Sequence, residues 1–426
     1  MNQRDYRLRT VDEELDELLV ELPAISLEGP RGVGKTATAE RRARTAYYLD
    51  VPAQNAVASA DPTLVLAGDA PVLIDEWQRE PAVWDAVRRA VDRGCEPGRF
   101  LLTGSAGPTP TPSHSGAGRI VTLRMRPMTL VERGVEEPTV GLEGLLAGTG
   151  GPIAGKTAVS LPDYVEEIVR SGFPAIRELT GRARRRQLDG YLRRIIDTDF
   201  RDQGHPVRRP EVLTRWLEAY AAATATTTSF EKIRDAATGG VADKPAKTTT
   251  MRYRDVLSSL MILDPVPAWL PSGNWLHRLG QSPKHHLADP GLAARALGLD
   301  ASALLTGDQP RTSVPRDGTL LGHLFESLVT LSVRVFSQRV EATVAHLRLH
   351  SGRREVDLVV ERPDRRVVAL EVKLGSAISD DDVAGLIWLR EQLGEALVDA
   401  AVIHTGPRAY RRKDGIAVVP AALLGQ

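Results

Sequence analysis

The sequence predicts a multidomain α/β protein, and three features of the 426-residue chain indicate this class. Near the N-terminus, short and wholly apolar strands alternate with helical patterns, which is typical of a parallel sheet covered on both faces. The middle of the chain has mainly helical patterns, and the last 145 residues combine helices with a strand hairpin. We expect domains at residues 1–135, 136–205, 206–281 and 282–426.

The composition excludes several classes of protein. The 55 basic residues balance 55 acidic ones, so any contact with nucleic acid must come from a local patch rather than from the overall charge. The single cysteine, Cys95, cannot form an internal disulfide, which suits a reducing cytosol. The N-terminus is polar, and no apolar run approaches the roughly 18 residues of a membrane span. We therefore expect a cytoplasmic protein without a membrane segment.

The first domain should contain three strands. An amphipathic helix at residues 8–22 opens the chain, and Pro23 stops it. Helical patterns lie between the strands at 37–48 and 83–93. The strands themselves are expected at residues 24–28, 72–74 and 100–102.

The next part of the chain contains loops and an arginine-rich helix. Residues 106–118 and 134–157 are rich in Gly, Pro, Ser and Thr, and we interpret both stretches as mobile loops. Helices are expected at 161–171 and 182–202. Between residues 182 and 209 there are nine arginines and four acidic residues, a pattern more typical of a solvated helix face than of a binding site.

Residues 210–280 have the outline of a winged helix, in which three helices precede an extended ribbon. The third helical stretch, 247–260, begins with residues suited to phosphate and base contacts, and a proline-rich extended segment follows at 261–270. The suited residues are Thr248, Thr249, Thr250, Arg252, Tyr253 and Arg254. The alternative, equally weighted, is a module that only packs between domains.

The last domain combines three strands, two flanking helices and a further strand into a compact α/β unit. A tight turn at 362–365 joins the two strands of its hairpin. The elements are expected at residues 320–336 (helix), 342–349, 356–360 and 367–373 (strands), 380–393 (helix) and 400–404 (strand).

A glycine-rich motif lies between the first strand and the next helix, where a P-loop must lie. It matches the P-loop pattern in full, with the residues Gly29, Pro30, Arg31, Gly32, Val33, Gly34, Lys35 and Thr36. The glycines let backbone N–H groups converge on phosphate oxygens. Lys35 would reach the β- and γ-phosphates, and the Thr36 hydroxyl would bind Mg²⁺. We therefore predict ATP and Mg²⁺ as cofactors.

The second strand supplies an acidic pair that suits this motif. Asp75 and Glu76 follow the strand directly, 40 residues after Lys35. Asp75 would hold the Mg²⁺ shell, and Glu76 would orient and polarise the attacking water. The sequence thus predicts hydrolysis as well as binding.

Three further residues are candidates at the same site. Thr103 or Ser105, at the tip of the third strand, could touch the γ-phosphate or simply cap the next turn. Arg119 could stabilise charge in the transition state, in cis or across a subunit boundary of a homo-oligomer.

The C-terminal hairpin forms a second candidate site. Glu371 and Lys373 end one strand on the same face, and the turn sets Asp357 roughly opposite 370–371. Asp357 and Glu371 would ligate Mg²⁺ or Mn²⁺, Glu326 could complete the shell, and Lys373 would orient or deprotonate the nucleophile. The alternative is a salt-bridged edge hairpin without catalytic chemistry.

These motifs, in this order, resemble the landmarks of bacterial and archaeal AAA-like P-loop ATPases of the DUF4143 family, and the resemblance extends over nearly the whole chain. The chain departs from the family pattern at Gly32, Trp77 and Pro290, none of which removes a chemical group. The landmarks are Gly29–Thr36, 74–78, 102–105, 118–119, 127–132, 172–174, 289–292, 322–326, 355–357 and 371–373.

The resemblance implies an AAA-like ATPase domain, a helical and winged-helix middle, and a C-terminal domain similar to the PD-(D/E)xK restriction-endonuclease fold. We therefore expect an ATP-hydrolysing DNA-processing protein that couples the ATPase to a metal-dependent nuclease. The alternative is a nucleotide-controlled regulatory ATPase whose nuclease-like domain binds but does not cleave. Nucleic acid, most simply DNA, is the expected partner.

Overall fold

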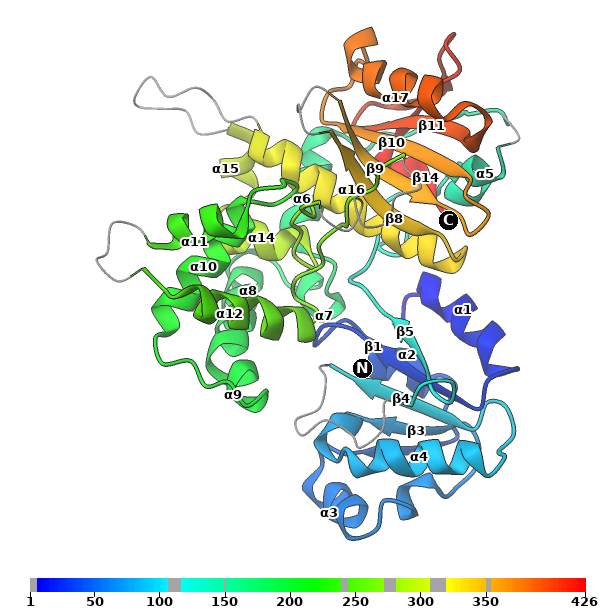
Figure 1. Cartoon of the computed structure of the whole chain (residues 1–426), viewed down its shortest axis with the longest axis vertical. Coiled ribbons are helices and arrows are strands. Elements are labelled where there is room, and N and C mark those ends of the chain that lie inside the picture. The colour runs from blue at the N-terminus through cyan, green and yellow to red at the C-terminus, as the bar shows by residue number, and fades with distance from the viewer. Residues whose placement is uncertain are drawn as a thin grey trace.

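The computed structural model describes residues 6–105, 116–148, 151–238, 244–271, 281–306, 319–349 and 354–426. In Figure 1 the N-terminal domain lies at the bottom, a group of helices lies at the left, and the C-terminal sheet lies at the upper right. Most of the expected loop at 106–118 falls outside the described residues, so that prediction stays open.

The N-terminal domain is built on a parallel sheet of five strands in the order β2-β3-β4-β1-β5. The three predicted strands are confirmed as β1, β3 and β4, and they lie next to one another. Because all strands run the same way, Glu28, Asp75 and Gly104 end their strands at one edge of the sheet. The strands are β1 (Ala24–Glu28), β2 (Thr45–Tyr48), β3 (Val72–Asp75), β4 (Phe100–Gly104) and β5 (Val121–Arg124).

The helices of this domain agree with the prediction except after the P-loop. The helix expected at 37–48 is wrong in its second half, because α2 ends at Glu40 and the next residues form the edge strand β2. Thr45, Tyr47 and Tyr48 favour a strand, and pairing with β3 satisfies their backbone. The helices are α1 (Thr10–Leu19), α2 (Lys35–Glu40), α3 (Pro52–Ala60) and α4 (Ala82–Asp92).

The helical part contains the helices that were predicted. A π-helical turn, Ile195–Asp199, continues α8 into α9. Two antiparallel β-bridges, Leu263 to Leu287 and Val266 to Lys284, join residues 262–271 to 281–287; we call this pair of segments the bridged ribbon. The helices are α6 (Leu161–Arg170), α7 (Pro174–Arg177), α8 (Gly181–Arg194), α9 (Phe200–Asp202), α10 (Pro210–Ala222), α11 (Phe230–Thr238), α12 (Lys247–Ser259), α14 (Pro290–Ala296) and α15 (Ala301–Thr306).

The C-terminal sheet has seven strands in the order β7-β12-β13-β11-β10-β9-β8, in which β7 is Gly155–Lys156 from an earlier part of the chain. The hairpin and its flanking strands and helices are confirmed, and three further strands follow β11 along the chain. Its elements are α16 (Thr319–Arg339), β8 (Thr343–Arg348), β9 (Glu355–Glu361), β10 (Val367–Lys373), α17 (Asp380–Leu393), β11 (Leu397–His404), β12 (Arg408–Arg411), β13 (Ala417–Pro420) and β14 (Leu424–Gly425).

The described residues of the segment at 134–157, which are 134–148 and 151–157, form a helix and two short strands that pair with the C-terminal domain, so the interpretation of this stretch as a mobile loop is wrong. Strand β6 (Val140–Gly141) pairs with β14, and β7 (Gly155–Lys156) pairs with β12. Between them, α5 (Leu142–Ala147) packs against α16 and β11. Backbone pairing with distant strands fixes a segment whose composition favours turns. The structure thus places these residues with the C-terminal sheet rather than with the helices of the 136–205 region.

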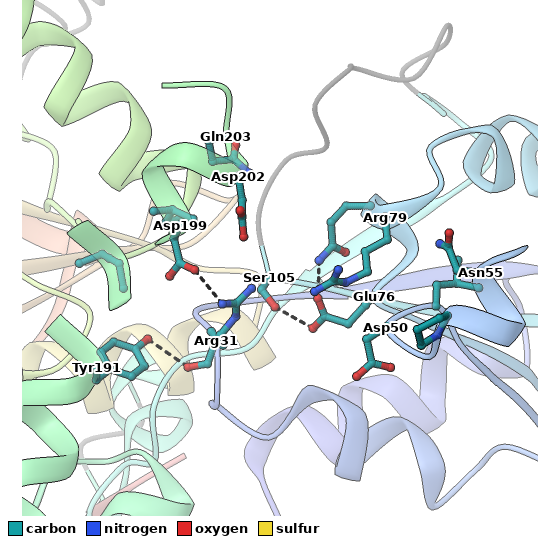
Figure 2. Close-up of a pocket in the computed structure, with 15 residues that line it drawn as sticks. Arg31, Asp50, Asn55, Glu76, Arg79, Ser105, Tyr191, Asp199, Asp202 and Gln203 are labelled. Atoms are coloured by element: carbon teal, nitrogen blue, oxygen red, sulfur yellow. Dashed lines mark hydrogen bonds and ion pairs between the residues drawn. The ribbon is translucent and has the colours of Figure 1, made fainter. Parts of the chain in front are cut away.

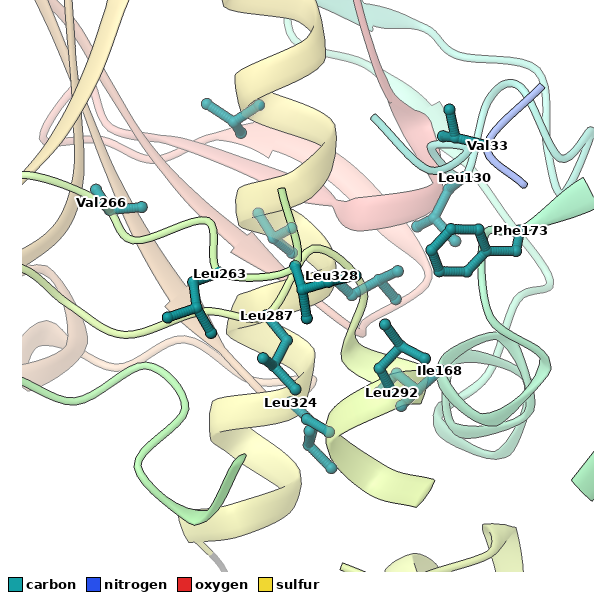
Figure 3. Close-up of a cluster of buried hydrophobic side chains, with 14 of the residues drawn as sticks. Val33, Leu130, Ile168, Phe173, Leu263, Val266, Leu287, Leu292, Leu324 and Leu328 are labelled. Carbon is teal, nitrogen blue, oxygen red and sulfur yellow. The ribbon is translucent and has the colours of Figure 1, made fainter. Parts of the chain in front are cut away.

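Helix α16 runs through the centre of the molecule. In Figure 3 its Leu324 and Leu328 meet Leu287 and Leu292, within a continuous core that also contains Val33 of the P-loop. Among the described residues, α16 is also a helix long and apolar enough to cross a membrane, which the sequence analysis did not expect. Because 67% of its apolar window is buried inside the protein, α16 has the character of a core helix.

A buried carboxylate, Asp264, links the N-terminal domain to α16. Its oxygens lie 2.8 Å from Arg126 Nε, 3.1 Å from Arg124 Nη2 and 3.0 Å from Arg334 Nη2. Burial alone would raise the pKa of Asp264, but the three guanidinium groups outweigh it and hold that pKa well below its usual value. Asp264 therefore stays ionised and joins β5, the bridged ribbon and α16.

Candidate nucleotide site and carboxylate cluster

The P-loop backbone requires glycine at several positions. Gly32 and Gly34 have φ angles of 77° and 113°, which other residues rarely adopt. A Cβ atom on Gly29 would lie 2.2 Å from the carbonyl oxygen of Met125. The chain therefore turns tightly between β1 and α2, as the motif predicts.

Lys35 lies folded into the loop. Its Nζ donates to the carbonyl oxygens of Gly29, at 2.8 Å, and Pro30, at 3.1 Å. Burial lowers the pKa of Lys35 to about 8, although the nearby Glu76 and Asp75 oppose this shift. A buried ammonium held only by two carbonyl groups suits an anionic ligand such as a phosphate.

Thr36 and Asp75 meet at the edge of the sheet, as predicted for a Mg²⁺ site. Thr36 Oγ1 donates to Asp75 Oδ1 at 2.7 Å, and the Thr103 hydroxyl donates to the same oxygen. Burial raises the pKa of Asp75. A hydroxyl and a carboxylate side by side are oxygen ligands of the kind that Mg²⁺ binds together with nucleotide phosphates, so the residues fit the predicted ion. The Thr103 hydroxyl thus holds the Asp75 carboxylate in place through a hydrogen bond.

Glu76 is held in a defined position beside Asp75. It has a φ angle of 56°, an uncommon conformation for a residue other than glycine. Ser105 Oγ donates to Glu76 Oε1 at 3.0 Å (Figure 2). Gln78 Nε2 donates to Glu76 Oε2 at 2.6 Å. Ser105 therefore orients Glu76, and Gln78, which the sequence analysis did not single out, does the same from the other side.

Two cavities flank the P-loop, and Glu76 and Ser105 line both. The first, of 700 Å³, extends over Lys35 and Thr36 and has a partly apolar wall. That wall is formed by Tyr6, Met125, Met128, Pro174 and Ala175. The second cavity, of 520 Å³, is more polar and lies between the sheet and the helical part (Figure 2).

Two side chains of the helical part form hydrogen bonds with the P-loop across the second cavity. Arg31 Nη1 donates to Asp199 Oδ1 at 2.7 Å, and the Tyr191 hydroxyl donates to the carbonyl oxygen of Arg31 at 3.0 Å. Asp199 lies in the π-helical turn between α8 and α9, a turn type that is frequent at functional sites. Sequence reasoning missed both partners, because their only local signal is an arginine-rich helix.

Arg119 does not belong to this site within one chain. It precedes β5 at the opposite edge of the sheet, where its Nε donates to Asp92 at 2.8 Å at the end of α4. The in-cis role is therefore wrong, because the parallel strands place residue 119 away from the P-loop. A contribution across a subunit boundary stays a prediction.

The predicted residues of the C-terminal hairpin are brought together. The register of β9 and β10 pairs Leu358 with Leu370, so the next residues, Asp357 and Glu371, lie opposite each other on one face. Lys373 Nζ donates to Glu371 Oε1 at 2.7 Å. Burial and the charge of Asp357 raise the pKa of Glu371 to about 8.

A lysine that the sequence analysis did not single out lies in this cluster. Lys284 Nζ is 2.9 Å from Glu326 Oε1, 2.8 Å from Asp357 Oδ1 and 3.2 Å from Glu355 Oε1. Burial and the charge of Asp357 raise the pKa of Glu326 to about 8, whereas Lys284 outweighs burial and lowers that of Asp357. We call Lys284, Glu326, Glu355, Asp357, Glu371 and Lys373 the carboxylate cluster. Within the described residues, no group of three or more His, Cys, Asp or Glu side chains is arranged to hold a metal ion.

Three family models match the chain. An AAA domain (AAA_14) matches residues 21–133, and two domains of unknown function match residues 161–303 (DUF8612) and 321–424 (DUF4143). The chain belongs to the AAA-like P-loop ATPases of the DUF4143 family. The family resemblance and the ATPase character of the N-terminal domain are therefore confirmed.

This DUF4143-family ATPase is similar to two mycobacterial proteins. They are the uncharacterized proteins Rv2008c of Mycobacterium tuberculosis and Mb2031c of Mycobacterium bovis, each 26% identical over 415 residues, which are 94% of this chain and 80% of theirs. The chain is also similar to the Walker-type ATPase PABY2304 of Pyrococcus abyssi, at 14% identity and a TM-score of 0.38, covering 69% of this chain and 99% of that one.

Two departures from the family pattern have a structural explanation in this DUF4143-family ATPase. The Trp77 ring lies in a buried apolar cluster, with its centroid 4.3 Å from that of Trp84 of α4. Asp289 is fully buried and accepts from the N–H groups of Gly172, at 2.7 Å, and Gly291, at 2.9 Å. Because Asp289 caps α14, Pro290 occupies the first helical position, which suits proline.

The start of α12 is only partly available for nucleic acid. Thr250 and Tyr253 are buried, and Arg254 lies over the Phe230 ring at 4.9 Å, so these residues pack within the helical part. Thr248 and Arg252 are exposed, and Thr249 is partly buried. Arg252 and Thr249 line a cavity of 690 Å³ with Arg208, Arg209 and Lys244.

Proposed function

We propose that this ATPase binds ATP with Mg²⁺ at the P-loop and hydrolyses it slowly, and that the cycle controls how the helical part holds the N-terminal domain. The observation that carries the proposal is the convergence of Lys35, Thr36, Asp75 and Glu76 at one edge of the sheet. A cytoplasmic location, where ATP is available and a lone cysteine stays reduced, is part of this proposal.

Each residue of the site has a role in the proposed reaction. Lys35 would leave the carbonyl oxygens of its own loop and donate to the β- and γ-phosphates. Thr36 and Asp75 would hold Mg²⁺, which neutralises phosphate charge when bound. Glu76, fixed by Ser105 and Gln78, would accept a hydrogen bond from the attacking water and orient it.

The base and the phosphates would enter different surroundings. The 700 Å³ cavity combines the phosphate-binding residues with an apolar wall, which suits an adenine ring. The polar cavity contains Arg31, Arg79 and Asp199 and would receive the γ-phosphate end and the water. Arg31 is part of the P-loop and also binds Asp199, which lies between α8 and α9. A movement of the P-loop on loss of the γ-phosphate would therefore be passed to these helices through this contact.

Purified variants test the proposal. Lys35→Ala should weaken nucleotide binding about 10- to 150-fold, the value of a lost charge-assisted contact. Glu76→Gln should leave binding intact and lower turnover about a hundredfold or more. Lys232→Ala and Glu96→Gln, two exposed residues that line neither cavity, are matched controls that should behave as wild type. Equal turnover in wild type and Glu76→Gln would refute the assignment of Glu76.

A second proposed function is metal-dependent cleavage of DNA by the C-terminal domain. It is favoured by the facing carboxylates of Asp357 and Glu371 with Lys373 beside them, and by the basic cavity around Arg252. If the C-terminal domain cleaves DNA, wild type should cut plasmid, linear and single-stranded DNA with Mg²⁺ or Mn²⁺ and Glu371→Ala should not, with ATP hydrolysis preserved. Such cleavage would contradict the exclusion of metal by Lys284 that is proposed below. Loss of DNA binding in Arg252→Ala would link the cavity to the same activity.

The competing proposal is a regulatory ATPase whose C-terminal domain does not cleave. It is supported by Lys284, which takes up oxygens of Asp357 and Glu326 that a metal ion would need. Retained DNA binding without cleavage under all of the above conditions would favour this alternative.

A further inference from the structure

Lys284 enters the carboxylate cluster from outside the C-terminal sheet. It lies on the bridged ribbon, where its backbone N–H and carbonyl both pair with Val266 at 2.9 Å. The ribbon is fixed on β8 as well, because the Trp269 N–H donates to the His346 carbonyl at 2.6 Å and His346 Nε2 lies 3.1 Å from the Ser282 carbonyl oxygen. The Lys284 side chain is 1% exposed, so its ammonium is sealed inside the protein.

The ammonium satisfies the oxygens on which a metal site would depend. Both oxygens of Asp357 already accept a hydrogen bond, Oδ1 from Lys284 at 2.8 Å and Oδ2 from the Val372 N–H at 2.9 Å. Glu326 Oε1 accepts from Lys284 at 2.9 Å. Glu371 Oε1 pairs with Lys373, and its buried Oε2 is the atom of that carboxylate without a hydrogen-bond partner.

A divalent cation needs several oxygens at about 2.0–2.6 Å and would lie within a few ångströms of the ammonium. Two cations at that separation repel strongly in a buried site. The cluster therefore suits one central cation, and the Lys284 ammonium already takes that position.

We propose that Lys284 takes the place of a divalent cation in the carboxylate cluster and excludes metal from it. The residues do not fit the metal that the nuclease-like fold implies as long as Lys284 is present. Removing the ammonium would leave the carboxylates of Glu326, Asp357 and Glu371 without a central charge, and we expect them to move together around Mg²⁺ or Mn²⁺ when the ion binds. The inference does not depend on ATP hydrolysis.

Binding of Mn²⁺ to the nucleotide-free full-length chain, followed by electron paramagnetic resonance and calorimetry, tests the proposal. In wild type, Glu371→Gln should leave Mn²⁺ binding unchanged, because the cluster holds no ion. Lys284→Met, which keeps the length of the side chain and removes the charge, should gain a site that binds about a hundredfold or more tighter than the cluster does in wild type. The double variant Lys284→Met/Glu371→Gln should lose that site.

Two further variants complete the design. Lys284→Arg keeps the charge and should exclude Mn²⁺ as wild type does, and Lys232→Met, an exposed lysine on α11, should gain no site. Mn²⁺ should raise the melting temperature of Lys284→Met and leave that of wild type unchanged. A wild-type Mn²⁺ site that Glu371→Gln abolishes would overturn the proposal, even where Lys284→Met fails to fold. A folded Lys284→Met without a new site would overturn it equally.

Discussion

Replacing Asp264 with asparagine should destabilise the whole molecule, because this carboxylate connects three arginines from two distant parts of the chain. Its side chain is 7% exposed, and its partners Arg126 and Arg334 are 8% and 15% exposed. Each charge-assisted contact contributes about 1.5–3 kcal/mol, and breaking a buried pair leaves unpaired charge behind at a net cost of about 3–5 kcal/mol. We expect Asp264→Asn to lower the free energy of unfolding by about 3 kcal/mol, because the amide keeps part of the hydrogen bonding.

Urea unfolding followed by tryptophan fluorescence measures this loss. Asp16→Asn is the matched control, because its carboxylate is 62% exposed beside Arg42 and should change stability by less than about 1 kcal/mol. The pH dependence has a defined sign. The lowered pKa of Asp264 stabilises the fold fully above the unfolded pKa of about 4, and this part is lost as the pH falls further. A loss in Asp264→Asn no larger than in Asp16→Asn would refute the reasoning.

Three further results are expected. Arg31→Ala and Asp199→Asn should each raise the KM for ATP about fivefold in a steady-state assay. The double variant should raise the KM no further than either single variant, because both substitutions break the same contact. Additive effects on the KM would contradict this coupling. Burial lowers the pKa of His346 to about 4, so wild type should lose up to about 3 kcal/mol of stability as the pH falls from 6.5 to 4. In urea titrations, His346→Gln should lose less stability than wild type over that range. Arg252→Ala should reduce the salt slope of DNA binding by about 1, whereas Arg254→Ala, packed on an aromatic ring, should leave it unchanged in fluorescence anisotropy.

The sequence was most informative where a feature is local. Apolar runs located β1, β3 and β4, and the P-loop pattern located the backbone that Gly32 and Gly34 form. The hairpin register followed from the turn, so Asp357 and Glu371 were correctly paired. In each case the decisive information lies within a few residues, where propensity and side-chain periodicity act.

Features that depend on distant pairing could not be predicted in this way. Strand β7 is two residues long and exists because β12 pairs with it, and no local pattern marks Gly155 or Lys156. Lys284 has no motif around it, and it reaches three carboxylates only because the ribbon folds over β9 and α16. The in-cis role of Arg119 was wrong for the same reason, since strand order decides at which edge of the sheet it lies.

The pairing of β6 with β14 and of β7 with β12 has a consequence for synthesis of the chain. The partner strands of residues 140–156 are translated roughly 250 residues later, a delay of about 10–50 s at ribosomal rates of about 5–20 residues per second. The N-terminal domain can fold as it emerges, whereas the two short strands that flank α5 must wait with unpaired backbone until β12 and β14 have left the ribosome. Emergence of β12 and β14 from the ribosome is therefore the step that allows the C-terminal domain to close.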